Sequence, residues 1–174
     1  LVELDSVVVS LSKTNPYLRI LNSESFFDDR VTVIYKDGFN FLRKNTIPFD
    51  IIIFDLPDPR EESLSKLYSL EGYRLASSNL TKNGAIVTQA TSPYFAPNAY
   101  WCIGHTIEKS GYEVLPYQVY IPSFGKWGFH IGFKDGGINR TIEIPPNLRF
   151  FDEDIWHSMR VFSKDIKQRP VYIN

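Results

Sequence analysis

Phe49-Asp-Ile-Ile-Ile-Phe-Asp-Leu-Pro-Asp-Pro59 is the most informative segment of the chain, because an apolar run leads directly into two carboxylates that are accompanied by two prolines. A continuous run of β-branched and aromatic residues bounded by turn formers is typical of an interior parallel strand. Asp55 and Asp58 then lie at the carboxyl end of that strand. Open α/β sheets bind their ligands at this edge, so the stretch predicts an α/β fold with an acidic site.

Predicted strands and helices alternate on both sides of this stretch, which is the pattern of a parallel sheet with crossover helices. Strands are predicted over 2–4, 30–35, 49–54 and 85–88, and helices over 5–11, 39–43, 64–80 and 94–111. Strands over 112–121 and 127–133 would form an antiparallel hairpin at the sheet edge. After residue 134 the composition changes, so we predict a domain over 1–134 and a tail over 135–174 whose short helix, over 150–162, packs on it.

The composition describes one soluble globular domain of 174 residues, 43% hydrophobic, with 19 basic and 20 acidic side chains. Nucleic-acid binding normally needs a basic excess, so no nucleic-acid partner is expected. Every apolar run is far shorter than the roughly 20 residues of a spanning helix, and no signal-like segment begins the chain, so we expect no membrane segment in it. The single Cys102 cannot form an internal disulfide, which favours a cytoplasmic location.

Asp55 and Asp58 are the strongest candidates for chemistry, because Pro57 and Pro59 restrict the backbone that carries them. Two neighbouring carboxylates suit divided roles, in which one accepts a proton and the other binds a cationic group. The residues alone also allow a proline-rich turn with no chemical role.

Two further acidic positions follow predicted strands. Glu3 could accept hydrogen bonds from ribose hydroxyls, as in nucleotide-binding α/β units, or it could be a solvated or helix-capping carboxylate. Asp37 could face an adenine amino group while Gly38 lets the ring approach, or this pair could simply begin a helix. No metal site is expected, because His105, His130 and His157 are dispersed without ligand-like spacing.

Polar and aromatic residues suggest the walls of a cleft. Gln89, Ser92 and Pro93 follow the fourth predicted strand at the same sheet edge. An aromatic wall for the methylenes or ammonium of an amine could come from Tyr68, Tyr73, Tyr120 and Trp127, although aromatic rings more commonly pack in the core. The sequence contains no nucleophile elbow and no phosphate-binding loop, so hydrolase and nucleoside triphosphatase activities have no support.

Seven motifs occur in one order: 2–5, 28–31, Asp37-Gly38, 55–59, 67–69 with Tyr73, 87–90 with 92–93, and 127–129. This order resembles the polyamine aminopropyltransferase family, the spermidine synthases, over roughly 2–133, and the motif at 55–59 and the segment 122–129 are its most specific parts. The Leu56-Pro57 dipeptide and the tail over 150–165 look closer to a bacterial branch that is often fused to a membrane domain.

The resemblance implies a Rossmann-like, methyltransferase-type fold with a mostly parallel sheet and a C-terminal antiparallel hairpin. It also implies transfer of the aminopropyl group of decarboxylated S-adenosylmethionine, a co-substrate, to putrescine or a related amine, without a prosthetic group or metal. Methylthioadenosine is released, and a homodimer is compatible with the resemblance.

The family's site residues carry over position by position. Glu3 would bind the ribose, and Asp37 with Gly38 the adenine. Asp55 would contact the co-substrate and deprotonate the attacking amine, assisted by Tyr68. On the acceptor side the resemblance places Asp58, which binds an ammonium, together with Gln89, Tyr120 and Trp127.

The chain also departs from the family pattern. Family members begin this domain with a strand, a Gly-rich turn and a small β-domain that precede Glu3, and this sequence contains none of them. We therefore expect a gap in the sheet, exposed apolar surface and weak or no activity of the chain by itself. Two alternatives stay open: a methyltransferase-like enzyme that binds intact S-adenosylmethionine, and a non-catalytic subunit that completes its sheet with another polypeptide.

Overall fold

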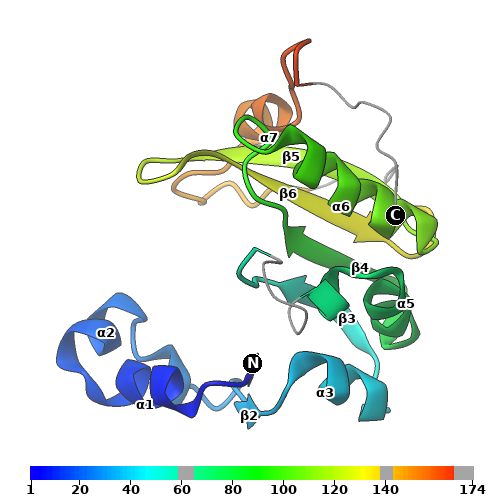
Figure 1. Ribbon diagram of the computed structural model, residues 1–174. Helices are drawn as coiled ribbons and strands as arrows, with labels where there is room; N and C mark the ends of the chain where they lie inside the picture. The colour runs from blue at the N-terminus through cyan, green and yellow to red at the C-terminus, as the bar shows by residue number, and fades with distance from the viewer. Residues whose placement is uncertain (59–64, 138–142, 167–174) are drawn as a thin grey trace. The chain divides into compact units, whose positions relative to one another are not determined.

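The computed structural model describes residues 1–58, 65–137 and 143–166 (Figure 1). The chain forms two compact units, Leu1–Thr46 and Ile47–Asn174. The division between residues 134 and 135, expected from composition, stays a prediction.

The first unit contains a small parallel sheet with short helices. Its elements are β1 (Val2–Glu3), α1 (Ser6–Thr14), α2 (Pro16–Leu21), the 3-10 turn η1 (Ser25–Phe27), β2 (Ile34–Tyr35) and α3 (Gly38–Lys44). β1 pairs with β2 in parallel, with Glu3 opposite Tyr35. Helix α2 was not predicted, although Asn15 caps it and Pro16 is its first residue, a common way to begin a helix.

The second unit is built on a four-stranded sheet in the order β3-β4-β6-β5. The strands are β3 (Phe49–Phe54), β4 (Leu80–Gln89), β5 (Glu113–Ile121) and β6 (Gly125–Phe133). β3 and β4 are parallel, whereas β6 is antiparallel to both β4 and β5. The α/β class and the C-terminal antiparallel hairpin are confirmed, and the sheet of this unit is mixed because the hairpin joins the parallel pair β3 and β4.

The strand order depends on which strand of the hairpin, β5 or β6, pairs with β4. Gly132 of β6 lets Ile86 and Ile107 approach so closely that a Cβ there would lie 2.8 and 2.9 Å from their side-chain carbons. Strand β5 contains Pro116, which has no N–H to donate and therefore suits an edge strand. β6 consequently lies against β4, and β5 forms the edge.

Strand β4 begins earlier than predicted. The segment 82–84, which we expected to precede the strand, lies within it as a bulge, because Phe49 pairs with Leu80 but Ile51 pairs with Ala85. The helix predicted over 64–80 is divided into the 3-10 turn η2 (Lys66–Tyr68) and α5 (Leu70–Ser78), since Ser69 caps α5. Leu64 lies outside the described residues.

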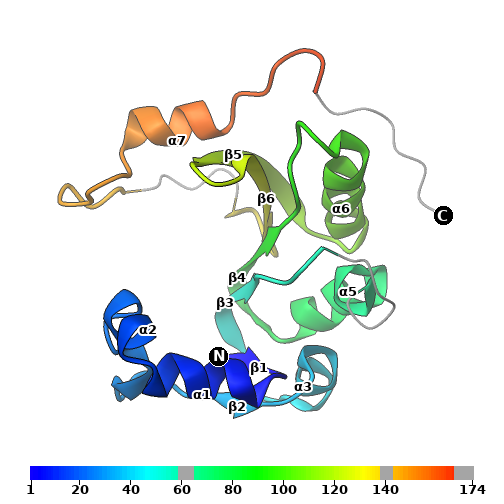
Figure 2. The ribbon, with the colours of Figure 1, turned by 60° about the vertical axis from the view of Figure 1, so that its left-hand side comes forward.

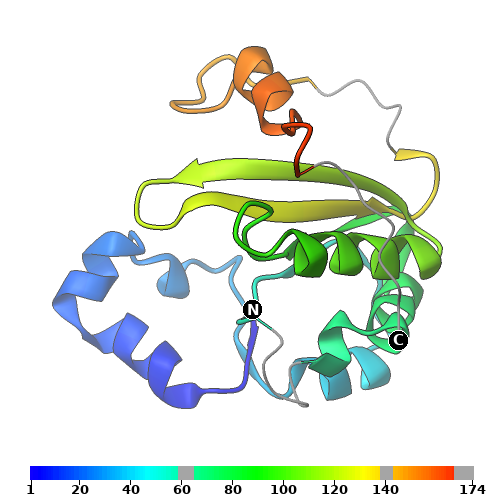
Figure 3. The same ribbon diagram turned by 45° about the horizontal axis from the view of Figure 1, so that its top comes forward.

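The core of this unit lies between the sheet and the helices α5 and α6 (Pro97–Lys109). Its fully buried side chains include Tyr73 of α5, Tyr100 and Ile107 of α6, and Ile86 and Thr88 of β4. The opposite face of the hairpin carries α7 (Glu153–Met159), so α6 and α7 lie on either side of β5 and β6 (Figures 2 and 3). Helix α7 is shorter than the predicted span of 150–162.

The free edge of β3 is apolar. Within the described residues β3 pairs with β4 alone, and Ile51 and Ile53 are 62% and 69% exposed. The absence of a central strand, expected from the family pattern, stays a prediction. Among the helices of the described ranges, none combines the length and the apolar character needed to span a membrane.

Candidate active site

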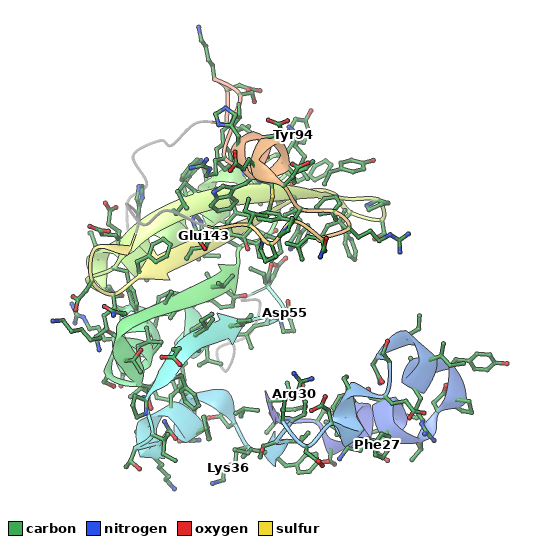
Figure 4. All side chains as sticks on the ribbon, turned by 180° about the vertical axis from the view of Figure 1, so that it is seen from behind. Phe27, Arg30, Lys36, Asp55, Tyr94 and Glu143 are labelled. Carbon is green, nitrogen blue, oxygen red and sulfur yellow. The ribbon has the colours of Figure 1, made fainter. Side chains whose placement is uncertain are left out.

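Asp55 lies at the carboxyl end of β3, as the sequence predicts (Figure 4). The strand ends at Phe54, which is buried and packs edge-on against Tyr73 with ring centroids 5.9 Å apart. The next residue, Asp55, is exposed, and Asp58 is partly buried. Phe54 therefore anchors the chain at the point where the two carboxylates begin. Pro59, expected to restrict them, lies outside the described residues.

A cleft of about 630 Å³ opens at this end of the sheet. Its lining combines the loop after β3, the end of β4 and the hairpin: Ile53, Phe54, Asp55, Leu56, Pro57, Asp58, Val87, Gln89, Tyr117, Ile121, Phe124, Trp127 and Phe129. Four predicted site residues are thus brought together, namely Asp55, Asp58, Gln89 and Trp127. The cleft has carboxylates at the loop and aromatic rings on the hairpin.

Gln89 connects these two sides. Its Nε2 donates to the carbonyl of Leu56 at 2.5 Å and to the hydroxyl of Tyr68 at 3.1 Å, and lies 3.3 Å from Oδ1 of Asp58. Its Oε1 accepts from Nε1 of Trp127 and from the backbone N–H of Thr91, both at 3.0 Å. An amide has two N–H donors and two acceptor lone pairs, so these neighbours use its full capacity. Gln89 therefore orients the groups around it.

The turn after Gln89 is held by β6. Thr91 has a φ of 59°, a left-handed conformation that is costly for a β-branched residue. Its carbonyl accepts from the N–H of Gly128 at 2.7 Å, and the N–H of Ala90 donates to the carbonyl of Gly128 at 2.8 Å. Gly128 is required there, because a Cβ would lie 2.4 Å from Cε2 of Tyr100 and 2.9 Å from the Thr91 carbonyl. Close backbone contact thus maintains a strained turn beside the cleft.

Tyr68 contributes a neutral phenol. Its hydroxyl donates to the Leu56 carbonyl at 3.2 Å while it accepts from Gln89. Burial raises the pKa of Tyr68 to about 12 against the lowering effect of the Gln89 hydrogen bond, and the charges of Asp58 and Asp55 each raise it by a lesser amount. The phenol therefore keeps its proton at neutral pH and acts as a hydrogen-bond donor beside the carboxylates.

The hairpin supplies the aromatic wall. Trp127 packs against Phe124 with ring centroids 5.5 Å apart, and Tyr117 stacks on Phe129 at 5.2 Å with an interplanar angle of 15°. Tyr117, Phe124 and Phe129 were not predicted from the sequence as wall residues. Trp127 and Phe129 share a face because strand side chains alternate, and Tyr117 lies directly opposite Phe129. The alternation was visible in the sequence, but the pairing depends on the hairpin register.

Two predicted wall residues lie elsewhere. Tyr120 pairs with Lys126, is 70% exposed and is not among the residues that line the cleft, because it alternates with Val119, which pairs with Trp127. Its role on the acceptor side stays a prediction. Tyr73 is fully buried in the core, which is the alternative that the sequence left open.

Glu3 and Asp37 lie at one edge of the first unit, because the parallel strands β1 and β2 end there. Glu3 accepts a hydrogen bond from the N–H of Asp5, and Asp37 caps α3 by accepting from the N–H of Asn40, both at 2.8 Å. Asp37 is thus a helix cap, whereas Glu3 binds the backbone of Asp5, the residue that caps α1. Binding of a nucleoside by Glu3, Asp37 and Gly38 stays a prediction.

The described residues contain no group of three or more His, Cys, Asp and Glu side chains placed to hold a metal ion. His130 packs in the core, where its Nε2 lies 2.9 Å from the Tyr100 carbonyl and its ring stacks on that of Tyr100. Burial lowers the pKa of His130 to about 4, so the ring is neutral at neutral pH.

The arrangement suits a flexible cation with an apolar body. Carboxylates at the loop attract an ammonium group, and the aromatic wall offers both apolar contact for methylenes and ring faces for a cation. A carboxylate that is not already neutralised by such a cation also accepts a proton. The cleft therefore favours an aliphatic amine over an anionic ligand.

Comparison with known proteins points to one family. A family model described as the spermine/spermidine synthase domain matches residues 1–141. Polyamine aminopropyltransferase 2 of Ralstonia nicotianae is 41% identical over 177 residues, which cover 100% of this chain and 34% of the relative. Polyamine aminopropyltransferase of Mycobacterium tuberculosis is 42% identical over 176 residues, which cover 98% of this chain and 33% of the relative. The chain thus spans about a third of the length of the curated relatives it matches.

Two solved structures share the fold. A spermidine synthase in complex with the transition-state analogue AdoDATO superposes with a TM-score of 0.80, over 96% of this chain and 59% of that chain. Spermidine synthase from Thermotoga maritima gives a TM-score of 0.78 over 96% and 58%. Each is 20% identical to this sequence, so the likeness is one of fold.

Proposed function

The chain belongs to the spermine/spermidine synthase family, and we propose that it carries the catalytic cleft of a polyamine aminopropyltransferase. The reaction transfers the aminopropyl group of decarboxylated S-adenosylmethionine to putrescine or a related amine and releases methylthioadenosine. The observation that carries the proposal is the pairing of Asp55 and Asp58 with the aromatic wall in one cleft.

The acidic loop favours this reaction over methyl transfer. Intact S-adenosylmethionine brings a carboxylate, which the charges of Asp55 and Asp58 repel, whereas the decarboxylated form ends in an ammonium that they attract. A methyltransferase-like function is therefore the weaker alternative.

Asp55 acts as the base. The acceptor amine is a nucleophile only after losing its proton, which passes to the Asp55 carboxylate. The nitrogen lone pair then forms a bond to the aminopropyl carbon next to the sulfonium, and the carbon–sulfur bond breaks with its electrons going to sulfur. The sulfur becomes a neutral thioether, so placement of the amine in line with that bond supplies much of the acceleration.

The neighbouring groups orient the reactants. Asp58, with its Oδ1 beside Nε2 of Gln89, binds an ammonium, and Trp127 presents its ring to the amine while its N–H is held by Gln89. The neutral phenol of Tyr68 assists by fixing the loop through the Leu56 carbonyl, since its raised pKa keeps it from serving as the base.

Glu3, Asp37 and Gly38 bind the ribose and adenine of the co-substrate. The support is that both carboxylates lie at the carboxyl edge of the parallel pair β1 and β2, where α/β sheets bind nucleosides. Tyr120 as an acceptor contact, a cytoplasmic location, a homodimer and reduced activity of the chain alone all stay predictions.

Calorimetry on the chain tests the function. We expect putrescine to bind and Asp58→Asn to weaken that binding about tenfold, since one charge is lost from the cleft. Decarboxylated S-adenosylmethionine should bind more tightly than the carboxylated form. The opposite preference would exclude aminopropyl transfer.

Turnover measured as methylthioadenosine release tests the base. Asp55→Asn should lower kcat by at least about a hundredfold, while amine affinity changes much less. Tyr94→Phe, an exposed residue outside the cleft lining, serves as the control and should leave both unchanged. An Asp55→Asn variant with full turnover would remove Asp55 from the mechanism.

One observation favours a second function, that of an assembly subunit. The free edge of β3 and the exposed Ile51 and Ile53 would accept a strand from another polypeptide. Light scattering with and without a co-expressed segment that carries the family's Gly-rich strand separates the two functions. A stable complex that forms without any amine binding by the chain would favour assembly.

A further inference from the structure

The segment after α7 wraps around the edge strand β5. Nε2 of Gln118 donates to the Val161 carbonyl at 2.6 Å, and Nε1 of Trp101 donates to the Ile166 carbonyl at 3.0 Å. Phe162 lies between these bonds and packs against Trp101 with ring centroids 5.5 Å apart. Helix α7 lies on one face of the hairpin, and Trp101 belongs to α6 on the other face, so residues 156–166 contact the edge strand and its helix from both sides (Figure 2). We call this segment, 156–166, the clasp.

On the cleft face the clasp acts through Trp156 of α7. Its ring meets Tyr117 with centroids 6.1 Å apart and an interplanar angle of 60°. The Arg160 guanidinium lies 4.8 Å from the centre of the Trp156 ring, and Phe151 packs against it at 5.9 Å. Trp156 is therefore held by its own helix and loop while it contacts Tyr117.

Tyr117 is the residue through which this contact reaches the cleft. It lines the cleft and stacks on Phe129, another lining residue. The cleft side of such a pair is open, so the rings keep their position only if other atoms pack against them. Burial raises the pKa of Tyr117 to about 12, which is consistent with a ring covered by its neighbours.

We propose that Trp156 is a positioning residue for amine recognition, which holds the Tyr117–Phe129 pair in place and thereby sets the width of the cleft. The inference rests on the proposed function. It gives the C-terminal segment a role in discrimination between amines of different length, although Trp156 does not itself line the cleft.

The test compares variants of the full chain by calorimetry with putrescine and with 1,7-diaminoheptane. Trp156→Ala should raise the Kd for putrescine about five- to tenfold, which corresponds to the interaction free energy of one aromatic pair. It should also reduce the difference in Kd between the two diamines. Trp156→Phe should restore both to within about twofold. Arg160→Gln, which removes the cation–π contact and the hydrogen bond from Nε of Arg160 to the Trp156 carbonyl, should act in the same direction with a smaller effect, because the Trp156 ring stays.

A control separates positioning from general stability. Phe162→Leu loosens the clasp on the α6 face, so it should lower the Tm without changing the diamine preference. In steady-state assays Trp156→Ala should raise the amine KM and change kcat less than about twofold, because Asp55 is untouched.

Two results overturn the inference in different ways. If the wild-type chain binds amines and Trp156→Ala leaves the preference between the two diamines unchanged, the positioning role alone is refuted. No amine binding by the folded wild-type chain would refute the proposed function, and the positioning role with it.

Discussion

At the scale of single residues, Gln89 determines how the two sides of the cleft meet. Its amide oxygen accepts from Trp127 and Thr91 and its amide nitrogen faces Leu56, Asp58 and Tyr68. Reversing the amide would place donors against donors and acceptors against acceptors. One buried side chain thus fixes the orientation of an indole and a carboxylate together.

Gln89→Glu tests this arrangement. One carboxylate oxygen would still accept from Trp127, but the other would face the Leu56 carbonyl and the Asp58 carboxylate, so we expect a loss of about 1–3 kcal/mol of unfolding free energy. The amine KM should also rise about tenfold as Asp58 is displaced. Urea denaturation and steady-state kinetics measure the two effects.

Asn79→Asp is the matched control. Asn79 is buried, and its side chain donates to the Leu75 carbonyl of α5. It directly precedes β4, whereas Gln89 is the last residue of that strand, and it does not line the cleft. Its substitution should lower stability and leave the amine KM unchanged. If Gln89→Glu behaves in the same way, Gln89 has no part in orienting Asp58.

His130 makes stability depend on pH. Burial lowers its pKa to about 4 in the folded chain, whereas an unfolded histidine titrates near 6.5. Between these values the unfolded state binds a proton that the folded state does not, so the unfolding free energy is complete above pH 6.5 and falls as the pH drops toward 4. The loss amounts to about 3 kcal/mol.

Denaturation at pH 7 and at pH 5 measures this effect. His130→Gln should lower stability at pH 7 but show a smaller difference between the two pH values than the wild type. His157→Gln, at an exposed position on α7, should keep the wild-type difference. An unchanged difference in His130→Gln would assign the pH dependence to other groups.

Residue types indicated the acidic side of the cleft more completely than the aromatic side. Asp55, Asp58 and Gln89 follow strands whose ends meet at one sheet edge, so a linear pattern was sufficient to predict them. Tyr117 and Phe129 meet across a hairpin, and their pairing depends on a turn of three residues between Ile121 and Gly125. A shift of one residue in that register would have exchanged Tyr117 for its neighbours.

At the scale of elements, a lysine joins α5 to the sheet. Nζ of Lys134, just after β6, donates to the carbonyls of Ser77 at 2.9 Å and Leu80 at 3.0 Å. Ser77 belongs to the last turn of α5, where carbonyls lack helical partners and the helix dipole attracts a cation. Lys134 thus acts as a C-terminal cap supplied by a distant strand.

Lys134→Met should lower the unfolding free energy by about 1–2 kcal/mol, because two carbonyls lose a charged donor while the aliphatic stem is kept. Guanidinium denaturation followed by far-ultraviolet circular dichroism measures the change. Lys126→Met, at an exposed position of β6, should have little effect. Equal stability of Lys134→Met and the wild type would show that solvent satisfies these carbonyls equally well.

The boundaries of some elements were predicted well, whereas the order of the strands in the sheet was not. Helix α3 and strand β3 were predicted within one or two residues, since a capping Asp37 and a continuous apolar run define their ends. The sequence did not predict that β6 pairs with β4, because the same hairpin forms whether β5 or β6 lies next to β4. Pro116 was the available signal, since proline in a strand indicates an edge.

At the scale of the whole molecule, the family match over residues 1–141 includes all of the first unit and the whole sheet of the second. Fold class and family could be predicted from the order of short motifs, because several of them end a strand or begin a helix, as 87–90 ends β4 and Asp37-Gly38 begins α3. The division into Leu1–Thr46 and Ile47–Asn174 could not, since it depends on contacts between segments far apart in the chain.

The hydrogen bond between Trp127 and Gln89 gives the cleft an optical reporter. The three tryptophans occupy different parts of the second unit: Trp101 in the helix beneath the sheet, Trp127 in the cleft wall and Trp156 on the C-terminal helix. Indole emission responds to the polarity around the ring and to its N–H partner. Amine entry should therefore alter the fluorescence of Trp127, and a Trp101→Phe, Trp156→Phe background would isolate that signal.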